Sequence, residues 1–257
     1  MRNNLTFEIV ENIAVIKVNR PKVYNSLTKE TVLELDNLIE EIKKNREIKV
    51  LVIGCEKNFA AGADIKTMVH CDEEQAKEFI FANTYNKIEN LEIPTIAAID
   101  GFALGGGLEL ALTCDFRIIT HNAKVGLPEI TLGIIPGAGG TIRLRHLIGL
   151  TKAREMIFFG ETINGEEAYK IGLANKIVNS EDLMPTAMEM ARKLQIKSSI
   201  ALKAAKNAIR AGIDGPNLET ALNKEAEIWV DLFKHEDARE GLKAFLEKRA
   251  PKYSWIQ

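Results

Sequence analysis

The sequence has few of the residues that mark a disulfide-stabilised, metal-binding or membrane-spanning protein. Its 3 cysteines, Cys55, Cys71 and Cys114, are odd in number and lack C-x-x-C spacing, which argues against a disulfide framework and a thiolate zinc site. The 4 histidines are scattered and form no pattern such as H-E-x-x-H, so we expect no metal ion. No apolar run approaches the about 20 residues that a membrane-spanning helix needs.

A strong charge of one sign and several common motifs are also missing. The formal net charge is -2, so no overall basic field would attract nucleic acid or an anionic membrane. G-x-S-x-G, G-x-G-x-x-G and G-x-x-x-x-G-K-[ST] do not occur, which argues against a serine hydrolase and against nucleotides held by such loops. Residues 1–6 lead into a strand-like pattern without an apolar signal core, and we expect a soluble, cytoplasmic protein.

What is present is a chain long enough to bury a substantial core. It has 257 residues, 46% of them hydrophobic, which suits one domain or a domain with an appendage. A stripe of apolar residues at helical spacing predicts a helix over Thr28–Asn45. Apolar runs predict strands at Thr6–Glu11, Ile13–Asn19, Val50–Gly54, Thr95–Ile99, Phe116–Thr120 and Lys124–Gly126.

The order of elements indicates an α/β fold with a helical end. The strand, loop and helix of residues 50–66 recur in residues 95–112, which indicates a repeated β-β-α unit stacked into a spiral. After Gly165 the pattern is almost wholly helical, and glycines punctuate it. We therefore expect a spiral catalytic core over residues 1–195 and a helical region over residues 196–257. The expected late helices are Glu166–Ile171, Glu181–Gln195, Ile200–Ala211, Asn217–Phe233 and Asp237–Lys248.

Two connections made almost entirely of small residues follow apolar strands and open helices. They are Phe59-Ala60-Ala61-Gly62-Ala63-Asp64 and Gly101-Phe102-Ala103-Leu104-Gly105-Gly106-Gly107-Leu108-Glu109. Small residues leave backbone N–H groups exposed at a helix start, where the helix dipole favours negative charge. If the two starts face one cavity, one N–H from each could hold a single carbonyl oxygen as it becomes negative. This arrangement is an oxyanion hole.

Two glutamates accompany these connections. Glu109 lies one turn into the second helix, and Glu129 follows the next strand in Gly126-Leu127-Pro128-Glu129. Both have apolar neighbours, which disfavour the charged carboxylate and raise its pKa toward neutrality. A pair of carboxyls of this kind near an oxyanion hole suggests acid and base chemistry.

With these motifs the chain resembles the crotonase superfamily, the enoyl-CoA hydratases and isomerases, over nearly its whole length. The resemblance rests on ordered blocks: Asn19-Arg20-Pro21-Lys22 with Asn25, Ala61 to Lys66, Gly101 to Ala111 with Cys114-Asp115, Pro128 to Thr141, and Glu240-Gly241 through Phe245 to Arg249. It implies the crotonase-like β-β-α spiral core with a helical C-terminal region. Within the family, glutamate at both catalytic positions is typical of hydratases.

The resemblance therefore implies a hydro-lyase of fatty-acid or short-chain acyl-CoA metabolism. It would add water to a trans-2-enoyl-CoA to give a 3-hydroxyacyl-CoA. Glu109 and Glu129 would be catalytic, and the N–H groups of Ala63 and Gly106 would form the oxyanion hole. Coenzyme A belongs to the substrate, so no separate cofactor is expected. By resemblance, contacts to the CoA and substrate fall to Lys22, Val23, Tyr24, Ala61, Asp64, Ile65, Lys66, Leu104, Pro136 and Gly137.

Two residues depart from the family's usual pattern, and assembly is implied by it. Leu127 stands where many hydratases have glutamine, which makes the pocket edge more apolar, and Tyr24 stands where relatives often have a smaller aliphatic residue. Crotonase chains assemble as trimers and often as dimers of trimers, so we expect a homotrimer or homohexamer whose C-terminal helices cover an active site.

Three alternatives remain open from the sequence. The first is another reaction on the same scaffold, either double-bond isomerisation or hydration of a branched substrate such as methylglutaconyl-CoA. The second is an RNA-binding relative, for which the lysines are spread too thinly to argue. The third is a catalytically silent subunit of a larger complex, which the presence of both glutamates argues against. The thinly spread lysines are Lys193, Lys197, Lys203 and Lys206.

Overall fold

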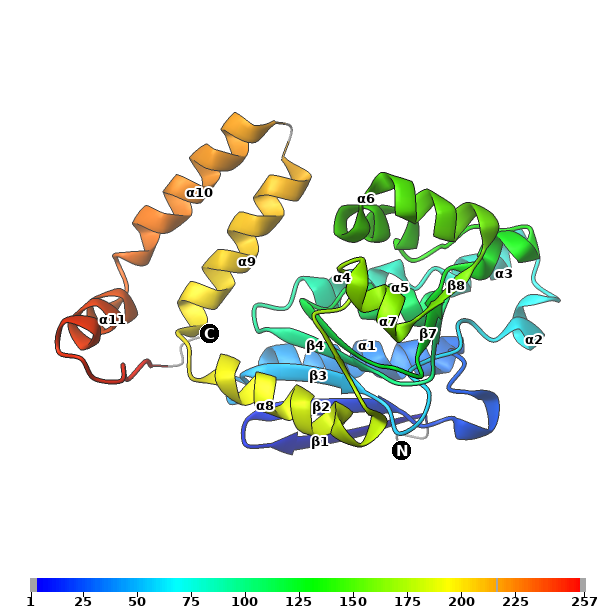
Figure 1. The fold of residues 1–257 in the computed structure, drawn as a ribbon, viewed down its shortest axis with the longest axis horizontal. Coiled ribbons are helices and arrows are strands. Elements are labelled where there is room, and N and C mark those ends of the chain that lie inside the picture. Colours follow the sequence, from blue (N-terminus) through cyan, green and yellow to red (C-terminus); the bar gives the residue numbers. More distant parts are fainter. Residues whose placement is uncertain (1–3, 216, 255–257) are drawn as a thin grey trace. The chain divides into compact units, whose positions relative to one another are not determined.

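The computed structural model describes residues 4–215 and 217–254, which fall into two compact units (Figure 1). The first unit contains residues 1–91 and 95–191, and the second contains residues 92–94 and 192–257. The predicted domain boundary after residue 195 stays a prediction, because a division into compact units does not show which part of the chain folds independently.

A six-stranded sheet runs through the first unit in the order β1-β2-β3-β4-β6-β9. The first two strands pair antiparallel, and the other neighbours pair parallel. Every residue of β3 and β4 is buried, as expected for parallel strands that are covered on both faces. The strand bounds are Leu5–Val10 (β1), Ile13–Val18 (β2), Val50–Gly54 (β3), Thr95–Ile99 (β4), Phe116–Thr120 (β6) and Lys176–Val178 (β9).

A second, three-stranded sheet lies in the order β5-β7-β8, with bounds Phe102–Leu104, Lys124–Gly126 and Thr162–Asn164. β5 pairs parallel with β7, and Ala60 forms an isolated parallel bridge with Ala103 of β5. Each strand of the run β3, β4 and β6 is thus followed by a segment that joins a second layer beside its neighbour. This is the predicted stacked β-β-α arrangement, and the α/β spiral fold is confirmed.

The helix predicted from the apolar stripe at Thr28–Asn45 is α1 (Lys29–Lys44). Thr28 is its N-cap and accepts a hydrogen bond from the Thr31 N–H, which satisfies one of the unpaired donors of the first turn. Other helices of this unit are α2 (Ile65–Met68), α3 (Glu73–Ala76), α4 (Ala82–Glu89), α5 (Gly106–Leu112), α6 (Gly140–Phe159) and α7 (Gly165–Lys170), with short 3-10 helices η1 (Pro21–Val23), η2 (Lys77–Phe79), η3 (Pro128–Leu132) and η4 (Ser180–Asp182).

Several elements differ from the sequence-based expectation. α6 was not predicted, because it starts at a glycine pair and is interrupted at Gly149, whose φ of 79° breaks the helical periodicity. β5, β8 and β9 have three residues each, too few to show a period of two. The region after Gly165 is consequently not almost wholly helical: β9 pairs there with β6.

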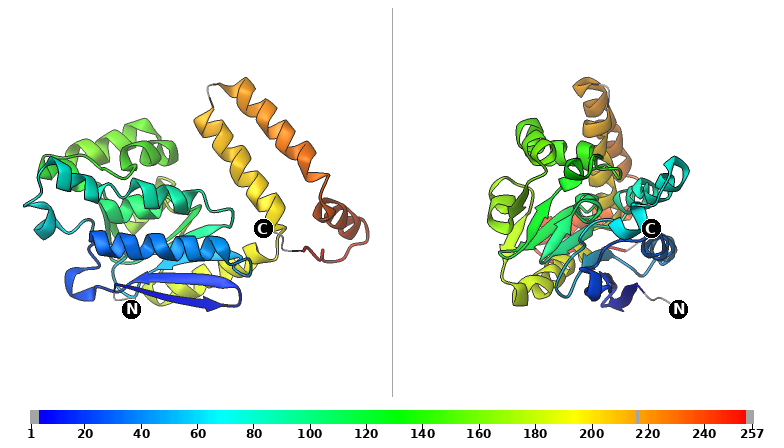
Figure 2. Two further views of the ribbon diagram at one scale, coloured as in Figure 1. Left: turned by 180° about the vertical axis from the view of Figure 1, so that it is seen from behind. Right: turned by 90° about the vertical axis from the view of Figure 1, so that its right-hand side faces the viewer.

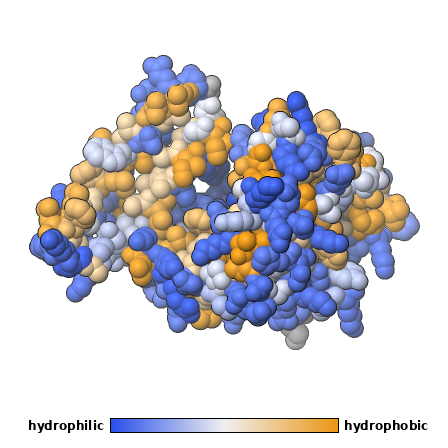
Figure 3. All heavy atoms as spheres, in the orientation of Figure 1, coloured by the Kyte–Doolittle hydropathy of each residue, from blue (hydrophilic) through white to orange (hydrophobic). Residues whose placement is uncertain are grey.

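The second unit is a helical assembly of α9 (Ser199–Asp214), α10 (Leu218–Leu232) and α11 (Glu236–Leu246), reached through α8 (Leu183–Gln195). α9 and α10 form a hairpin whose helices run side by side (Figure 2). Hydrophobic residues are prominent along this hairpin (Figure 3). Among the described residues, no helix combines the length and hydrophobicity needed to cross a membrane. Exposed apolar residues of the unit include Ile209, Ile213, Leu218, Leu222, Trp229, Val230, Phe233, Leu242, Phe245 and Leu246.

Candidate active site

Backbone hydrogen bonds hold the first small-residue connection in place, and they leave the N–H groups of Gly62 and Ala63 without an acceptor among the described residues. Leu27 N–H donates to the Gly62 carbonyl at 2.7 Å, and Asp64 N–H donates to the Leu27 carbonyl at 2.9 Å. The intervening Ala63 N–H has no hydrogen-bond acceptor among the described residues. Because its neighbours are fixed on both sides, this donor is preformed and remains available to a ligand.

The second connection ends at the start of α5 in the same way. Gly105 N–H donates to the Gly126 carbonyl at 2.9 Å, and the Gly105 carbonyl accepts the first helical hydrogen bond from Glu109 N–H. Gly106 is the first residue of the helix, so its N–H is one of the donors that a helix leaves unpaired. Within the described chain this N–H has no acceptor.

The two connections touch each other at glycines. A Cβ atom placed on Gly62 would lie 4.0 Å from the Gly105 Cα and 3.0 Å from the Leu104 carbonyl oxygen. Both glycines also have positive φ, 90° at Gly62 and 50° at Gly105, which other residues rarely adopt. The positive φ favours glycine at both positions, and at Gly62 a side chain would also crowd the Leu104 carbonyl. Ala63 and Gly106 follow directly after this contact.

Glu109 projects from α5 into the buried interior, where its side chain is almost inaccessible. Its Oε1 accepts hydrogen bonds from the Ala138 N–H at 2.7 Å and the Gly140 N–H at 2.8 Å. Burial raises the pKa of the Glu109 carboxyl, and these two N–H donors and the Arg143 charge offset part of that increase. Glu109 is thus a fixed carboxyl whose ionised form is supported by hydrogen bonds.

Glu129 lies in η3 and is only partly buried, but its Oε2 is buried without a hydrogen-bond partner among the described residues. Burial raises the pKa of Glu129 to about 7, and the nearby charge of Glu109 contributes to the increase. The carboxyl packs on Gly105, because a Cβ there would lie 2.9 Å from its Oε1. The two glutamates, twenty positions apart, therefore flank the same short stretch of backbone.

The residues predicted to contact coenzyme A near the N-terminus also form one local cluster. Lys22 and Val23 lie in η1, and Tyr24 follows with a left-handed backbone. The Tyr24 carbonyl accepts a hydrogen bond from the Ala61 N–H at 3.1 Å, which joins this turn to the first connection. The Tyr24 ring is 58% exposed and stands edge-on to Phe102 with ring centroids 5.8 Å apart.

Residues 64–66 open α2 next to this cluster. The Asp64 carboxylate caps the helix by accepting from the Lys66 N–H at 3.2 Å, and it lies 3.6 Å from the Arg20 guanidinium. Asp64 thus has structural partners, whereas the Ile65 and Lys66 side chains are exposed. Their roles toward coenzyme A stay predictions.

The remaining predicted contact residues border the glutamates. Leu104 ends β5 against Gly62. Pro136 is buried and Gly137 is exposed, and both directly precede Ala138, which donates to Glu109. Their contact with a substrate is likewise untested and remains a prediction.

Sequence reasoning missed two side chains that support this site. The buried Tyr85 of α4 donates its O–H to the Gly106 carbonyl at 2.8 Å. Arg143 of α6 donates to the Ala138 carbonyl at 2.7 Å. Neither residue belongs to a recognisable pattern, since one is a single tyrosine on a short helix and the other follows an unpredicted helix start.

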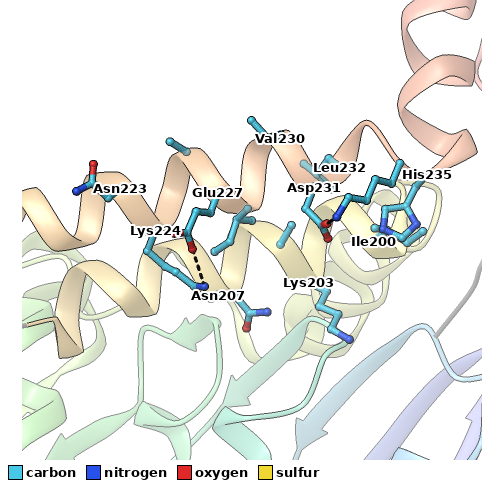
Figure 4. A pocket seen from close by; sticks show the side chains of 14 residues that line it. Ile200, Lys203, Asn207, Asn223, Lys224, Glu227, Val230, Asp231, Leu232 and His235 are labelled. Atoms are coloured by element: carbon cyan, nitrogen blue, oxygen red, sulfur yellow. Dashed lines mark hydrogen bonds and ion pairs between the residues drawn. The ribbon is translucent and has the colours of Figure 1, made fainter.

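A separate hollow of about 1080 Å³ lies in the second unit between α9 and α10 (Figure 4). None of the predicted site residues lines it. Four of its charged side chains form two ion pairs, Lys224 with Glu227 at 3.0 Å and Lys234 with Asp231 at 2.5 Å, and a fifth, Lys203, pairs with Glu92 outside the lining. Because it has no carboxyl or N–H arrangement suited to acyl chemistry, we place the candidate active site at the two glutamates instead.

Known proteins are similar to this chain in sequence and in fold. The sequence model of the family described as enoyl-CoA hydratase/isomerase matches residues 8–255. The chain is 42% identical over 251 residues to the short-chain-enoyl-CoA hydratase of Clostridium acetobutylicum, and 40% identical over 250 residues to the crotonyl-CoA hydratase of Syntrophomonas wolfei, with 96% of each chain covered in both cases.

The crystal structure of an enoyl-CoA hydratase from Bacillus anthracis superposes with a TM-score of 0.94 at 39% identity, covering 99% of this chain and 100% of that one. These matches span both small-residue connections and both glutamates. The resemblance seen in the sequence motifs thus extends to the whole fold, and the chain belongs to the enoyl-CoA hydratase/isomerase family, within the crotonase superfamily.

Proposed function

We propose that this protein is an enoyl-CoA hydratase that adds water to a trans-2-enoyl-CoA and yields a 3-hydroxyacyl-CoA. The observation that carries the proposal is the pair Glu109 and Glu129, two carboxyls with raised pKa that flank the backbone between Gly105 and Glu109. The relatives named as hydratases, about 40% identical over 96% of the chain, support an enoyl-CoA hydratase and hydro-lyase.

In this proposal the unpaired N–H groups of Ala63 and Gly106 hold the thioester oxygen. Their hydrogen bonds strengthen as negative charge moves onto that oxygen, which draws electrons from the conjugated double bond and makes the β-carbon electrophilic. The dipole of α5 adds to the field at Gly106, since the helix N-terminus favours negative charge. Both donors belong to backbone that is already fixed, so little reorganisation is needed during reaction.

The glutamates divide the proton transfers. Glu109, whose anion is supported by the Ala138 and Gly140 N–H groups, holds and deprotonates the attacking water. Glu129, with a pKa of about 7 and no hydrogen-bond partner on its buried Oε2 within the described chain, carries a proton for part of the time at neutral pH. It helps to orient the water and delivers the proton to the α-carbon.

Coenzyme A arrives as part of the substrate, and the proposal needs no further cofactor. Lys22 and Lys66 are exposed cations at the edge of the cluster joined by Tyr24 and Ala61, and they suit the phosphates of the nucleotide end. The adenine end is assigned to Lys22, Val23 and Tyr24, and the pantetheine side to Ala61, Asp64, Ile65 and Lys66. The other proposed contacts to the CoA or substrate are Leu104, Pro136 and Gly137.

The assembly proposed with this function is a homotrimer or a dimer of trimers, acting in fatty-acid or short-chain acyl-CoA metabolism. Its support on this chain is the apolar side chains exposed on the second unit, such as Trp229 at 60% and Phe245 at 82%. Exposed apolar patches of this kind mark surfaces that associate with other chains.

A substrate panel tests the proposed reaction. The purified protein is incubated with crotonyl-CoA, with a trans-3-enoyl-CoA and with methylglutaconyl-CoA, and the products are identified by mass spectrometry and chromatography. We expect addition of water to crotonyl-CoA to be the fastest reaction. Isomerisation of the 3-enoyl substrate alone, or hydration of only the branched and carboxylated substrate, would replace the proposed activity with another on the same scaffold.

A further inference from the structure

The Arg143 side chain forms an ion pair and several hydrogen bonds with residues that border the candidate site. Its guanidinium forms a two-point ion pair with Glu89 of α4, with Nε to Oε1 at 3.2 Å and Nη2 to Oε2 at 2.7 Å. Nη2 also donates to Asn86 Oδ1 at 2.6 Å, and Nη1 donates to the Ala138 carbonyl at 2.7 Å. The Arg143 side chain is only 12% exposed, so this planar set of bonds is well shielded from water.

The backbone from Ala138 to Gly140 lies between this guanidinium and Glu109. On one side the Ala138 carbonyl accepts from Arg143, and on the other the N–H groups of Ala138 and Gly140 donate to Glu109 Oε1. Gly139 lies directly under the guanidinium, because a Cβ at that position would meet Arg143 Nη1 at 2.1 Å. A displacement of the Arg143 side chain can therefore reach Glu109 through this loop, in addition to the direct effect of the Arg143 charge.

The same helix that carries Glu89 also contacts the other half of the site. Tyr85, one turn earlier on α4, is fully buried and donates its O–H to the Gly106 carbonyl at 2.8 Å. α4 thus fixes the first turn of α5 directly and the Glu109-binding loop through Arg143.

We propose that Arg143, held by Glu89 and Asn86 of α4, is a positioning residue that sets the orientation of the Glu109 carboxyl through the Ala138–Gly140 loop. The inference rests on the proposed function, since it assigns Glu109 to proton transfer. Arg143 itself is not among the residues proposed to contact the substrate.

The charges around Glu109 give the proposal a direction that can be measured. Burial raises the pKa of Glu109, whereas the Arg143 charge from α6 lowers it. The other titratable groups beside it are Tyr85 from α4 and Glu129 from η3, whose pKa values the Glu109 charge raises. Arg143→Gln removes the cation and leaves Glu89 without its ion-pair partner, so we expect the pKa of Glu109 to rise. Glu89→Gln leaves the cation without its anionic partner, so we expect the pKa of Glu109 to fall.

The test combines three variants with a matched control. Arg143→Gln, Arg143→Lys and Glu89→Gln are compared with Lys87→Gln, which lies on the same helix but pairs with Asp36 and Glu40 of α1. We expect kcat for crotonyl-CoA hydration to fall about 10- to 100-fold in Arg143→Gln and Glu89→Gln, with KM nearly unchanged, because a small misplacement of a reacting group costs rate. Arg143→Lys should recover part of the loss, and Lys87→Gln should resemble wild type.

The pH profile distinguishes a role of Arg143 in positioning Glu109 from a purely structural role in holding α4 against α6. The acidic limb of kcat should move to higher pH in Arg143→Gln and to lower pH in Glu89→Gln. A purely structural role would reduce stability and active fraction in both variants without opposite shifts. Loss of thermal stability with an unchanged kcat per folded molecule and an unchanged profile would overturn the proposal.

A direct titration keeps this test independent of the reaction. In protein labelled with ¹³C at the glutamate carboxyl, the Glu109 resonance is assigned by its loss in Glu109→Gln and followed with pH. Opposite displacements of its titration in Arg143→Gln and Glu89→Gln would support the positioning role even if wild-type protein failed to hydrate crotonyl-CoA. The same midpoint in both variants and wild type would refute it. Should Arg143→Gln not fold, Glu89→Gln against Lys87→Gln decides alone, with a lower midpoint expected.

Discussion

At the scale of single residues, Glu129 has the most unusual environment in the site. Its Oε2 is buried without a hydrogen-bond partner in the described chain, and its pKa is about 7. The carboxyl is therefore close to half protonated at neutral pH in the folded protein, whereas in the unfolded chain it ionises near 4.5. The folded state binds this proton more tightly than the unfolded state does.

This difference predicts a pH-dependent cost in stability. Because the folded state holds the proton more tightly, the contribution of Glu129 to stability is complete below about pH 4.5 and is lost as pH rises through about 7. We expect a cost of roughly 2 kcal/mol above pH 7, less than the full shift implies because the carboxyl is partly solvated. Glu129→Gln should remove this cost, so that the variant gains on wild type in urea unfolding at pH 8 compared with pH 5.

The control for this measurement is Glu8→Gln, a change at a glutamate of β1 far from the site in the sequence and outside the buried core. It should alter stability similarly at both pH values. An equal effect of Glu129→Gln at pH 5 and pH 8 would show that the carboxyl is solvated and not perturbed by burial.

At the scale of elements, the position of α5 depends on close contact with the first connection. A Cβ atom on Gly107 would lie 2.1 Å from the Ala60 carbonyl oxygen, so a side chain there must push the helix away. Gly107→Ala should lower the free energy of unfolding by about 1–3 kcal/mol, the usual cost of overpacking, and reduce hydratase kcat as Gly106 moves. Urea unfolding and steady-state kinetics measure the two effects.

A second helical glycine provides the matched comparison. A Cβ atom added to Gly212 in α9 would meet nothing within 4 Å, so Gly212→Ala gains helix propensity without a clash. It should raise the free energy of unfolding by about 0.5–1 kcal/mol. If Gly107→Ala stabilised the protein as Gly212→Ala does, the close contact of α5 with Ala60 would be wrong.

The elements also show what the sequence could and could not predict. α1 and the strands β3 and β4 were predictable, because an apolar stripe at helical spacing and short apolar runs are local signals. α6 and the three-residue strands β8 and β9 were not, because glycines and short length leave no period to read.

The same limit applies to the candidate site. Glu109, Glu129 and the two small-residue connections stood out because their residue types themselves indicate a chemical role. The Arg143 and Tyr85 contacts depend on the packing of α4 against α5 and the Ala138–Gly140 loop. No spacing of residues in the sequence predicts this packing. Residues that act by position are for this reason found only in the fold.

At the scale of the whole molecule, the helical unit exposes large apolar side chains, as expected for a surface that associates with other chains. Phe245 and Leu246 at the end of α11 are 82% and 81% exposed. We expect the protein to have the mass of three or six chains by size-exclusion chromatography with light scattering. Phe245→Asp should shift it toward smaller species, since burying a charge at an interface is costly.

A neighbouring polar position supplies the control for assembly. Lys243→Asp changes charge on the same helix at an exposed position, where the lysine lies 3.8 Å from Glu247. It should leave the mass unchanged. A wild-type protein that elutes as a single chain at micromolar concentration would contradict the proposed assembly.

The assignment of Glu109 and Glu129 is tested by following the loss of the conjugated-thioester absorbance after crotonyl-CoA is mixed with wild type, Glu109→Gln or Glu129→Gln. Both substitutions keep size and shape while removing the ionisable proton, and thermal unfolding checks that both variants fold. We predict rapid loss of absorbance with wild type and a fall in kcat of about 100- to 10,000-fold in each variant. Near-wild-type rates in both variants would contradict the assignment of Glu109 and Glu129 as the catalytic pair.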